Sequence, residues 1–274
     1  MTTRLLGLDL DGTVLRDHDK SIAPQDLAAI ERARDHGLIV TIITGRLYGG
    51  TRDVARQAGI KGPIGCADGC HIVDASTHAP LALHVLEQSC LNQAYELACA
   101  QPGVWCYGLE PEQIVHEEDA PHLRYVGLWA PSFAIAPRLP DASERCIKLV
   151  AVGPRASIEE AFRLVRHQLG AQVSAFTFPA TLLGSDEHVL LVRQAGPDKG
   201  TALRWLARHH GVAIEETAVV GDWLNDAPMF KVAGRAFVMG KAHPELTALA
   251  TDVLDAPRGA GLGVAQAIDT ILAR

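Results

Sequence analysis

Short apolar runs alternate with amphipathic stretches over the first quarter of the chain. Residues 5–10 (LLGLDL) and 38–44 (LIVTIIT) are apolar and rich in branched side chains, as expected of strands buried on both faces. Between them, residues 21–37 have the spacing of an amphipathic helix. A second helix is expected at 49–59 and a third short strand at 63–69. This alternation predicts a parallel sheet with helices on both faces.

From about residue 80 the pattern changes. Two helical segments, 84–103 and 157–170, are combined with β-rich segments that do not alternate strictly with them. Such grouping is typical of an α+β module rather than of a parallel α/β sheet. The β-rich segments are 103–109, 145–153, 171–178 and 188–194.

The strand–helix alternation returns from residue 196. Strands are expected at 217–222, 235–240 and 252–255, with helices at 198–211 and 263–273. We therefore expect the two ends of the chain to build one sheet, which the α+β module interrupts.

Composition narrows the class of protein. Hydrophobic residues make up 48% of the 274 residues, enough for a sizeable core. A net charge of −7 argues against non-specific nucleic-acid binding, and no apolar run reaches the length of a membrane-spanning helix. The chain starts directly with a strand, so we expect no signal peptide. The six cysteines form no CxxC pair, which favours reduced thiols and a cytoplasmic location.

Polar residues follow the apolar strands at their carboxyl ends, where ligands collect in parallel α/β sheets. Asp9 and Asp11 end the first strand, and Thr44 ends the second. Asp222 ends a later strand, and Lys199 opens a helix. Each alone has an ordinary explanation as a turn residue, a helix cap or a solvated helix start. Together they would bring carboxylates, a hydroxyl and an ammonium group to one edge of the sheet.

This set of side chains suits phosphoryl transfer. A carboxylate can act as the nucleophile and form an aspartyl-phosphate, and a second one can protonate the leaving group and then activate water. Neighbouring carboxylates repel each other, so we expect a hard cation such as Mg²⁺ to bind them. Lys199 and Thr44 would hold the remaining phosphate oxygens.

Five motifs make the chain resemble the haloacid dehalogenase-like hydrolase superfamily, and within it the Cof-type phosphatases with a large, type IIB cap. The motifs are DLDGT at 9–13, TGR at 44–46, DKGTAL at 198–203, GDWLND at 221–226 and VMGKA at 238–242. The resemblance implies an α/β fold with a Rossmann-like parallel sheet core, formed by 1–79 and 196–274. An inserted α+β cap, 80–195, would select the substrate. It further implies a phosphoric monoester hydrolase that acts on small phosphorylated metabolites, such as sugar phosphates.

The resemblance also implies residue roles. Asp9 would be the nucleophile and a Mg²⁺ ligand, and Asp11 the general acid/base and a ligand through its backbone carbonyl. Asp222 would be the third protein ligand, and Asn225 and Asp226 would orient this shell. The phosphoryl group and the substrate would contact Thr44, Lys199, Gly12, Thr13, Gly45 and Arg46.

Three residues depart from the family pattern. Asp68 stands where the family usually has Asn, Trp223 where many relatives have Gly, and Lys241 where Asn is usual. None of the three removes a catalytic group. Asp68 and Trp223 are expected near the cleft between cap and core, and they argue against carrying over a substrate preference from the family.

Other functions use the same chemistry. A phosphomutase or another phosphotransferase would keep both aspartates of DLDGT. A non-catalytic receiver module, phosphorylated on Asp9, would be about half as long and would lack the insert.

The glycine-rich segment 259–268 lies too near the end for a nucleotide-binding βαβ unit, and the spacing of Cys66, Cys70 and His71 does not fit a zinc knuckle. The partner expected is a small phosphorylated metabolite, with no nucleic acid and no membrane, and the oligomeric state stays open.

Overall fold

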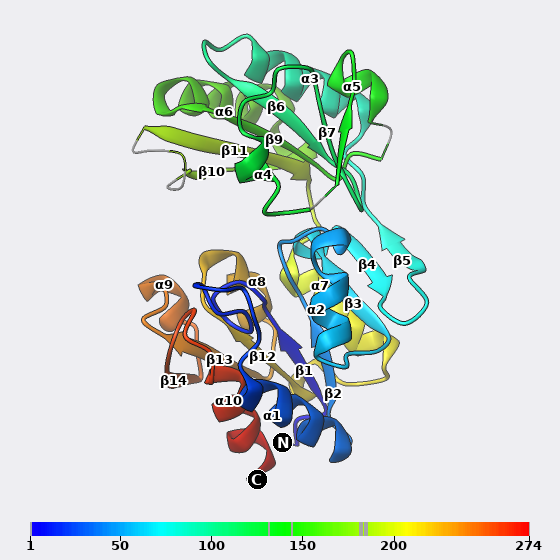
Figure 1. The fold of residues 1–274 in the computed structure, drawn as a ribbon, viewed down its shortest axis with the longest axis vertical. Helices are drawn as coiled ribbons and strands as arrows, with labels where there is room; N and C mark the ends of the chain where they lie inside the picture. The colour runs from blue at the N-terminus through cyan, green and yellow to red at the C-terminus, as the bar shows by residue number, and fades with distance from the viewer. Residues whose placement is uncertain (1, 131, 144, 181–182, 184–185, 274) are drawn as a thin grey trace. The chain divides into compact units, whose positions relative to one another are not determined.

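The computed structural model describes residues 2–130, 132–143, 145–180, 183 and 186–273, which form two compact units (Figure 1). The core unit consists of Met1–Gly45, Thr51–Ala82 and Pro197–Arg274, and the insert unit of Arg46–Gly50 and Leu83–Gly196. The predicted boundaries, 79/80 and 195/196, lie close to these. The assignment of catalysis to one unit and substrate selection to the other stays a prediction.

The core unit is built on a five-stranded parallel sheet. The central strand β1 pairs with β2 on one side and with β12 on the other, and β13 and β14 extend the sheet beyond β12. All four residues of β1 are buried, as its apolar sequence predicts. In spatial order the strands are β14 (Asp252–Pro257), β13 (Arg235–Gly240), β12 (Thr217–Gly221), β1 (Leu5–Leu8) and β2 (Ile39–Ile42).

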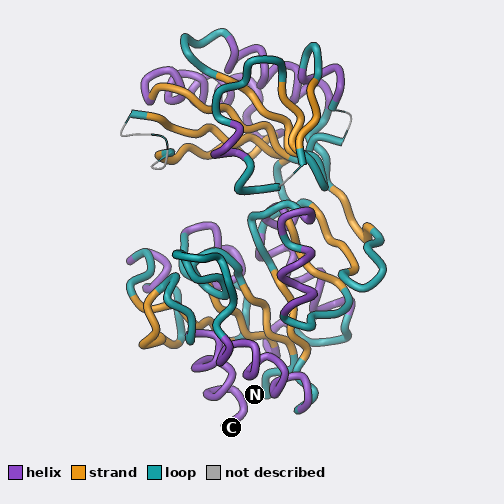
Figure 2. Tube along the Cα trace, in the orientation of Figure 1, coloured by secondary structure: helices purple, strands orange, loops and turns teal. Residues whose placement is uncertain are grey.

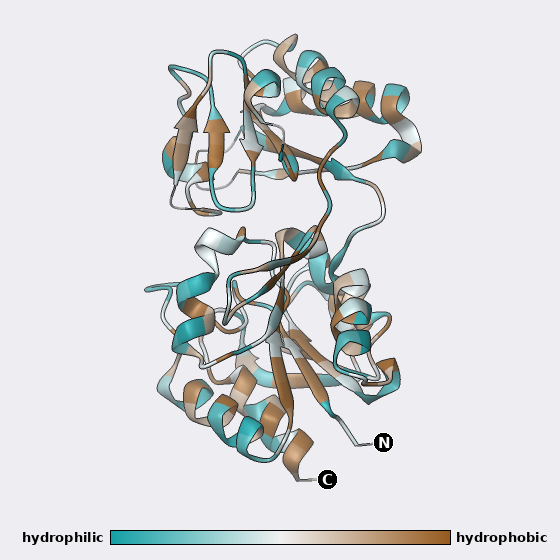
Figure 3. Cartoon of the chain, turned by 90° about the vertical axis from the view of Figure 1, so that its right-hand side faces the viewer, coloured by the Kyte–Doolittle hydropathy of each residue, from teal (hydrophilic) through white to brown (hydrophobic). Residues whose placement is uncertain are grey.

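Helices cover both faces of this sheet. Figure 1 shows α1 beside α10 on one side of the sheet, and Figure 3 shows the sheet between helices. On the other face Leu203 and Leu206 of α7 join a core cluster with Leu5 and Val219. The predicted Rossmann-like α/β fold is therefore confirmed. The helices are α1 (Pro24–Asp35), α2 (Arg52–Gln57), α7 (Lys199–His209), α8 (Ala227–Phe230), α9 (Pro244–Thr247) and α10 (Gly263–Leu272).

The third predicted strand is a strand, but it does not simply extend the parallel sheet. β3 (Pro63–Cys66) pairs in antiparallel fashion with β4 (His71–Asp74), and β5 (Pro80–Leu83) completes a separate three-stranded sheet. A single parallel bridge, Ile43 to Gly65, joins β3 to the end of β2. The tight turn between β3 and β4 creates this hairpin, which the alternation pattern alone did not reveal.

The insert unit is an α+β sandwich with one mixed sheet (Figure 2). Its six strands are antiparallel except for the parallel pair β7–β8. The order is β10 (Val173–Pro179), β11 (Glu187–Gln194), β9 (Lys148–Pro154), β6 (Trp105–Leu109), β7 (Ile114–His116) and β8 (Phe133–Ile135).

One face of this sheet is covered by α3 (Gln88–Cys99) and α6 (Arg155–Leu169). In α6 the buried residues Ile158, Ala161, Val165 and Leu169 recur at helical spacing, so one apolar stripe faces the sheet. Two short helices, α4 (Leu123–Val126) and α5 (Leu139–Ala142), complete the unit. Among the described residues, no helix is long and apolar enough to cross a membrane.

Candidate active site

Three buried carboxylates meet at the carboxyl edge of the core sheet. Asp9 follows β1, and Asp222 and Asp226 follow β12, the neighbouring parallel strand. One oxygen from each carboxylate lies within 4.8 Å of the others, and all three side chains are buried. Carboxylate oxygens are the donors that hard divalent cations prefer, so this cluster fits such a metal.

Lys199 links two of these carboxylates. It is the first residue of α7, and its side chain is fully buried. Its Nζ donates to Asp9 Oδ1 and to Asp226 Oδ1, both at 2.6 Å. Burial alone would lower the pKa of Lys199, but the charges of Asp226 and Asp9 outweigh it, so the pKa lies well above its usual value. Lys199 is therefore a fixed cation within the cluster.

The turn after β12 holds Asp226 in place. Asp226 Oδ2 accepts hydrogen bonds from the backbone N–H groups of Asp222 (2.9 Å) and Trp223 (3.1 Å). With Lys199 Nζ on Oδ1, both Asp226 oxygens accept hydrogen bonds, those on Oδ2 from the backbone of the turn itself and the one on Oδ1 from the buried side chain of α7. The role of Asp226 as a residue that orients the metal ligands stays a prediction.

Asp222 is engaged by donors that can move. Thr13 Oγ1 donates to Asp222 Oδ1 at 3.2 Å, and Arg258 Nε donates to Oδ2 at 2.7 Å. A hydroxyl can rotate, and the Arg258 side chain is 38% exposed, so either can give way to a metal. Gly12, at φ +82°, lies so close to Asp222 that a Cβ at this position would collide with the Asp222 carboxylate.

Arg258 is a site residue that sequence reasoning missed. It directly follows β14, another parallel strand of the same sheet. The strand-end rule that selected Asp9 and Asp222 would have selected Arg258 too, had it been applied to the strand at 252–255. Its guanidinium also lies over the ring of Trp223, 5.4 Å from the centroid, and Trp223 is 49% exposed.

Burial raises the pKa values of two acids in the cluster. For Asp9 the main cause is burial, followed by the charge of Asp226, and Lys199 only partly offsets them. The pKa of Asp222 is raised for the same reasons, with Arg258 opposing the shift. When all of these side chains are charged, the three carboxylates of the cluster carry one more charge than the two cations that contact them, the ammonium group of α7 and the guanidinium group after β14. An added dication would stabilise the ionised cluster and also admit a phosphate dianion.

A second group of predicted residues lies beside the cluster. Asp68 is in the left-handed region (φ 54°), and its Oδ1 accepts a hydrogen bond of 3.1 Å from Asn225 Nδ2. A Cβ on Gly45 would lie 3.1 Å from the same Oδ1, and the Asp68 charge acts on Lys199. Thr44 is buried after β2, and its backbone carbonyl accepts from the Asp68 N–H at 2.9 Å. Thr44, Gly45 and the Asp68 turn therefore lie beside the carboxylate cluster.

Three further residues singled out from the sequence lie outside the buried carboxylate cluster. The Asp11 side chain is exposed, in contrast to that of Asp9. Arg46 belongs by its contacts to the insert unit, where its guanidinium donates to the Gly50 carbonyl at 3.3 Å. Lys241 is exposed and left-handed, with φ 60°.

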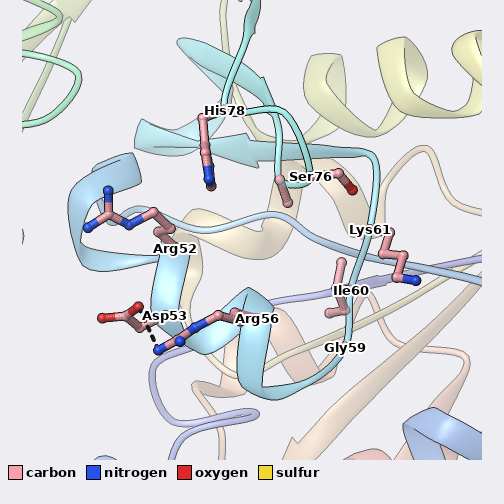
Figure 4. Close-up of a pocket in the computed structure, with 9 residues that line it drawn as sticks. Arg52, Asp53, Arg56, Gly59, Ile60, Lys61, Ser76 and His78 are labelled. Carbon is pink, nitrogen blue, oxygen red and sulfur yellow. Dashed lines mark hydrogen bonds and ion pairs between the residues drawn. The ribbon is translucent and has the colours of Figure 1, made fainter.

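A separate hollow of about 540 Å³ in the core unit contains none of the predicted site residues. It lies between α2 and the β4–β5 turn and is lined by basic side chains including Arg52, Arg56 and Lys61 (Figure 4). These side chains are exposed, and Arg56 pairs with Asp53 at 3.1 Å. The hollow therefore lacks the buried, preorganised groups that the carboxylate cluster provides.

The family model for haloacid dehalogenase-like hydrolases matches residues 6–268, which include every residue of the cluster. The chain belongs to the haloacid dehalogenase-like hydrolase family. The family predicted from the five motifs is thereby confirmed, and so is the expectation of a hydrolase.

Named relatives of this hydrolase are phosphatases. The chain is 26% identical over 254 residues to HMP-PP phosphatase of Serratia proteamaculans, an alignment that covers 90% of this chain and 87% of the relative. It is 28% identical over 274 residues to phosphoglycolate phosphatase of Pyrobaculum aerophilum, covering 99% and 97%. The fold matches a haloacid dehalogenase-like hydrolase from Bacteroides thetaiotaomicron with a TM-score of 0.86 and 22% identity, over 98% of this chain and 100% of the other.

Proposed function

We propose that this hydrolase is a Mg²⁺-dependent phosphatase that cleaves small phosphate monoesters through an aspartyl-phosphate on Asp9. The observation that carries the proposal is the buried group of Asp9, Asp222 and Asp226, with Lys199 fixed between two of its members. The activities named for the relatives, HMP-PP phosphatase and phosphoglycolate phosphatase, support the reaction class.

Asp9 would attack the phosphorus atom. Lys199 occupies its Oδ1, and we assign the attack to Oδ2. The phosphorus–oxygen bond to the leaving group then breaks, and Asp11 supplies the proton that this oxygen needs. In the second step Asp11 takes a proton from water, which attacks the phosphorus and releases phosphate and free Asp9. The exposed side chain of Asp11 suits a group that exchanges protons with substrate and water.

The remaining residues would bind and orient. Asp9, Asp222 and the Asp11 carbonyl would hold Mg²⁺, which when bound neutralises the carboxylates and the incoming phosphate. Lys199 and Thr44 would bind phosphoryl oxygens, helped by the loop residues Gly12, Thr13, Gly45 and Arg46. Asn225 and Asp226 would keep the Asp222 turn in position.

A phosphate-release screen over a broad panel of phosphorylated metabolites tests this function. We expect phosphate release from several small monoesters, and none from any of them with Asp9→Asn, measured with the variant shown to be folded by circular dichroism. Appreciable turnover by Asp9→Asn would contradict the covalent mechanism. Conversion of sugar phosphates into isomers without phosphate release would instead indicate a mutase.

We further propose that the predicted cap, residues 80–195, selects the substrate. Exchanging Leu83–Gly196 for the corresponding segment of the Serratia relative should transfer that relative's substrate ranking, because the proposed catalytic residues all lie in the core unit. A ranking that stays with the core unit would contradict this role.

A further inference from the structure

Two cysteines of the insert unit lie side by side. Cys99 is the last residue of α3, and Cys106 is the second residue of β6. Their Sγ atoms are 3.4 Å apart, which is van der Waals contact or closer. A disulfide bond requires about 2.05 Å, so the sulfurs need to approach by only about 1.4 Å.

The two thiols differ in exposure. Cys99 is exposed at the end of the helix, whereas Cys106 is only 7% exposed. A dissolved reagent can therefore reach Cys99 directly, while Cys106 lies behind it and touches it. This is the arrangement of an attacking thiol with a neighbouring resolving thiol.

The surroundings favour the thiolate form of Cys99. The hydrogen bond between Cys99 and Cys106 lowers the pKa of Cys99 most, and Tyr95 and Arg138 act in the same direction, against the effects of burial and Glu117. The same contact raises the pKa of Cys106, so the exposed sulfur is the one that ionises first. The thiolate is the form that attacks disulfides.

We propose that Cys99 and Cys106 form a reversible intramolecular disulfide when the protein meets an oxidised low-molecular-weight disulfide. The Cys99 thiolate attacks one sulfur of the oxidised reagent, forming a mixed disulfide and releasing one reduced thiolate. Cys106 then loses its proton and attacks Cys99 Sγ, which releases the second reduced thiol. The two cysteines are oxidised, and one reagent disulfide is reduced to two thiols.

Two other cysteines of the insert unit serve as internal controls. Cys90 is 2% exposed on the same helix as Cys99, and its Sγ contacts Gln172 Oε1 at 3.8 Å. Cys146 is 1% exposed, and burial raises its pKa to about 12. Both should stay reduced under conditions that oxidise the Cys99–Cys106 pair.

The test is to incubate the purified wild-type protein with oxidised glutathione and map its peptides by mass spectrometry without reduction. We expect a peptide pair joined through Cys99 and Cys106, a mass lower by two hydrogens, and recovery of both thiols with dithiothreitol. Cys99 should react at least about tenfold faster than Cys90 and Cys146. Cys106→Ser should stop at the glutathione adduct on Cys99, Cys99→Ser should leave Cys106 unmodified, and Cys90→Ser should form the disulfide normally.

Two results would overturn the proposal. One is a wild-type protein in which Cys99 and Cys106 both remain free thiols. The other is a stable glutathione adduct on wild-type Cys99, because Cys106 would then have failed to resolve it. Since both results are measured on the wild-type chain, the experiment stays decisive even where Cys106→Ser folds poorly.

Discussion

Lys199 and Asp226 form an ion pair of 2.6 Å in which both side chains are completely excluded from solvent. The same ammonium group pairs with Asp9 at 2.6 Å. Removing one partner of a buried pair leaves an uncompensated charge, which typically costs about 3–5 kcal/mol. We therefore expect Lys199→Met to lower the free energy of unfolding by about that amount in metal-free buffer and to abolish phosphatase activity. Urea unfolding of Lys199→Met measures the first effect.

The matched control for this experiment is Lys231→Met, which removes an exposed lysine of the same unit. Its free energy of unfolding should change by less than about 0.5 kcal/mol. Equal unfolding free energies for the two variants would show that the Lys199 pair does not stabilise the fold.

We expect Asp11 to transfer protons during catalysis and to contribute little to the stability of the fold, because its side chain is exposed. Asp11→Asn should lower turnover of an alkyl phosphate by about 10²–10⁴-fold, the range typical of general acid–base groups, and leave the melting temperature nearly unchanged. The loss in the rate of phosphoenzyme formation should be smaller with p-nitrophenyl phosphate, because its leaving group needs little protonation. Asp53→Asn, at another exposed carboxylate, should retain full activity. Because Asp11 also activates water in the second step, which both substrates share, the decisive rate is that of phosphoenzyme formation in a single turnover, and an equal loss of that rate for both substrates would argue against proton donation by Asp11.

Metal binding should be visible in stability as well as in activity. A ligand of the folded state at 100 times its dissociation constant stabilises it by about 2.7 kcal/mol. We expect Mg²⁺ to raise the melting temperature of the wild type and to have little effect on Asp222→Asn. Chelation should abolish phosphate release, and added Mg²⁺ should restore it. Full activity in excess EDTA would exclude the proposed role of the metal.

In the metal-free protein, the contribution of Asp9 to stability should decrease as pH rises through its raised pKa. Burial, together with the charge of Asp226, raises the pKa of Asp9, so the folded chain binds this proton more tightly than the unfolded chain does. The stabilisation is complete below the ordinary carboxyl pKa and disappears as pH rises through the raised value. Asp9 can contribute a slope of up to about 1.4 kcal/mol per pH unit. Unfolding in EDTA across this range should show a shallower slope for Asp9→Asn than for the wild type.

Lys241 has a left-handed backbone conformation, which Asn adopts more readily than Lys. Its φ is 60°, in the left-handed region that Asn adopts much more readily than Lys. Asn is also the residue usual at this position in the family that the motifs predicted. Lys241→Asn should therefore raise the free energy of unfolding by about 0.5–1 kcal/mol. Lys241→Ala, which removes the charge but keeps the strain, is the control and should give no such gain.

The strand-end motifs could be found from sequence because parallel strands impose a simple rule. Successive apolar runs at 5–10, 38–44 and 217–222 indicate buried parallel strands, and such strands place their following residues at one edge. That rule selected Asp9, Thr44 and Asp222, with Asn225 and Asp226 following the same strand end, and the motif resemblance supplied their roles. The chain also implied an inserted α+β module, because an alternating pattern stopped and later resumed. These inferences depend on local periodicity and chain order, which a sequence displays directly.

Pairwise contacts between distant segments are decided by tertiary structure. The sequence placed Lys199 at a helix start, but only the packing of α7 against the sheet brings its ammonium group between Asp9 and Asp226. Arg258 reaches Asp222 because β14 lies in the same sheet as β12, and the hairpin of β3 and β4 brings Asp68 to Asn225. The direction of a side chain and the contact between separate loops leave no periodic pattern in the sequence, so the sequence alone does not predict them. The sequence by itself therefore determined the type of fold and the chemistry at its strand ends, whereas the tertiary structure alone decided which charges neutralise one another.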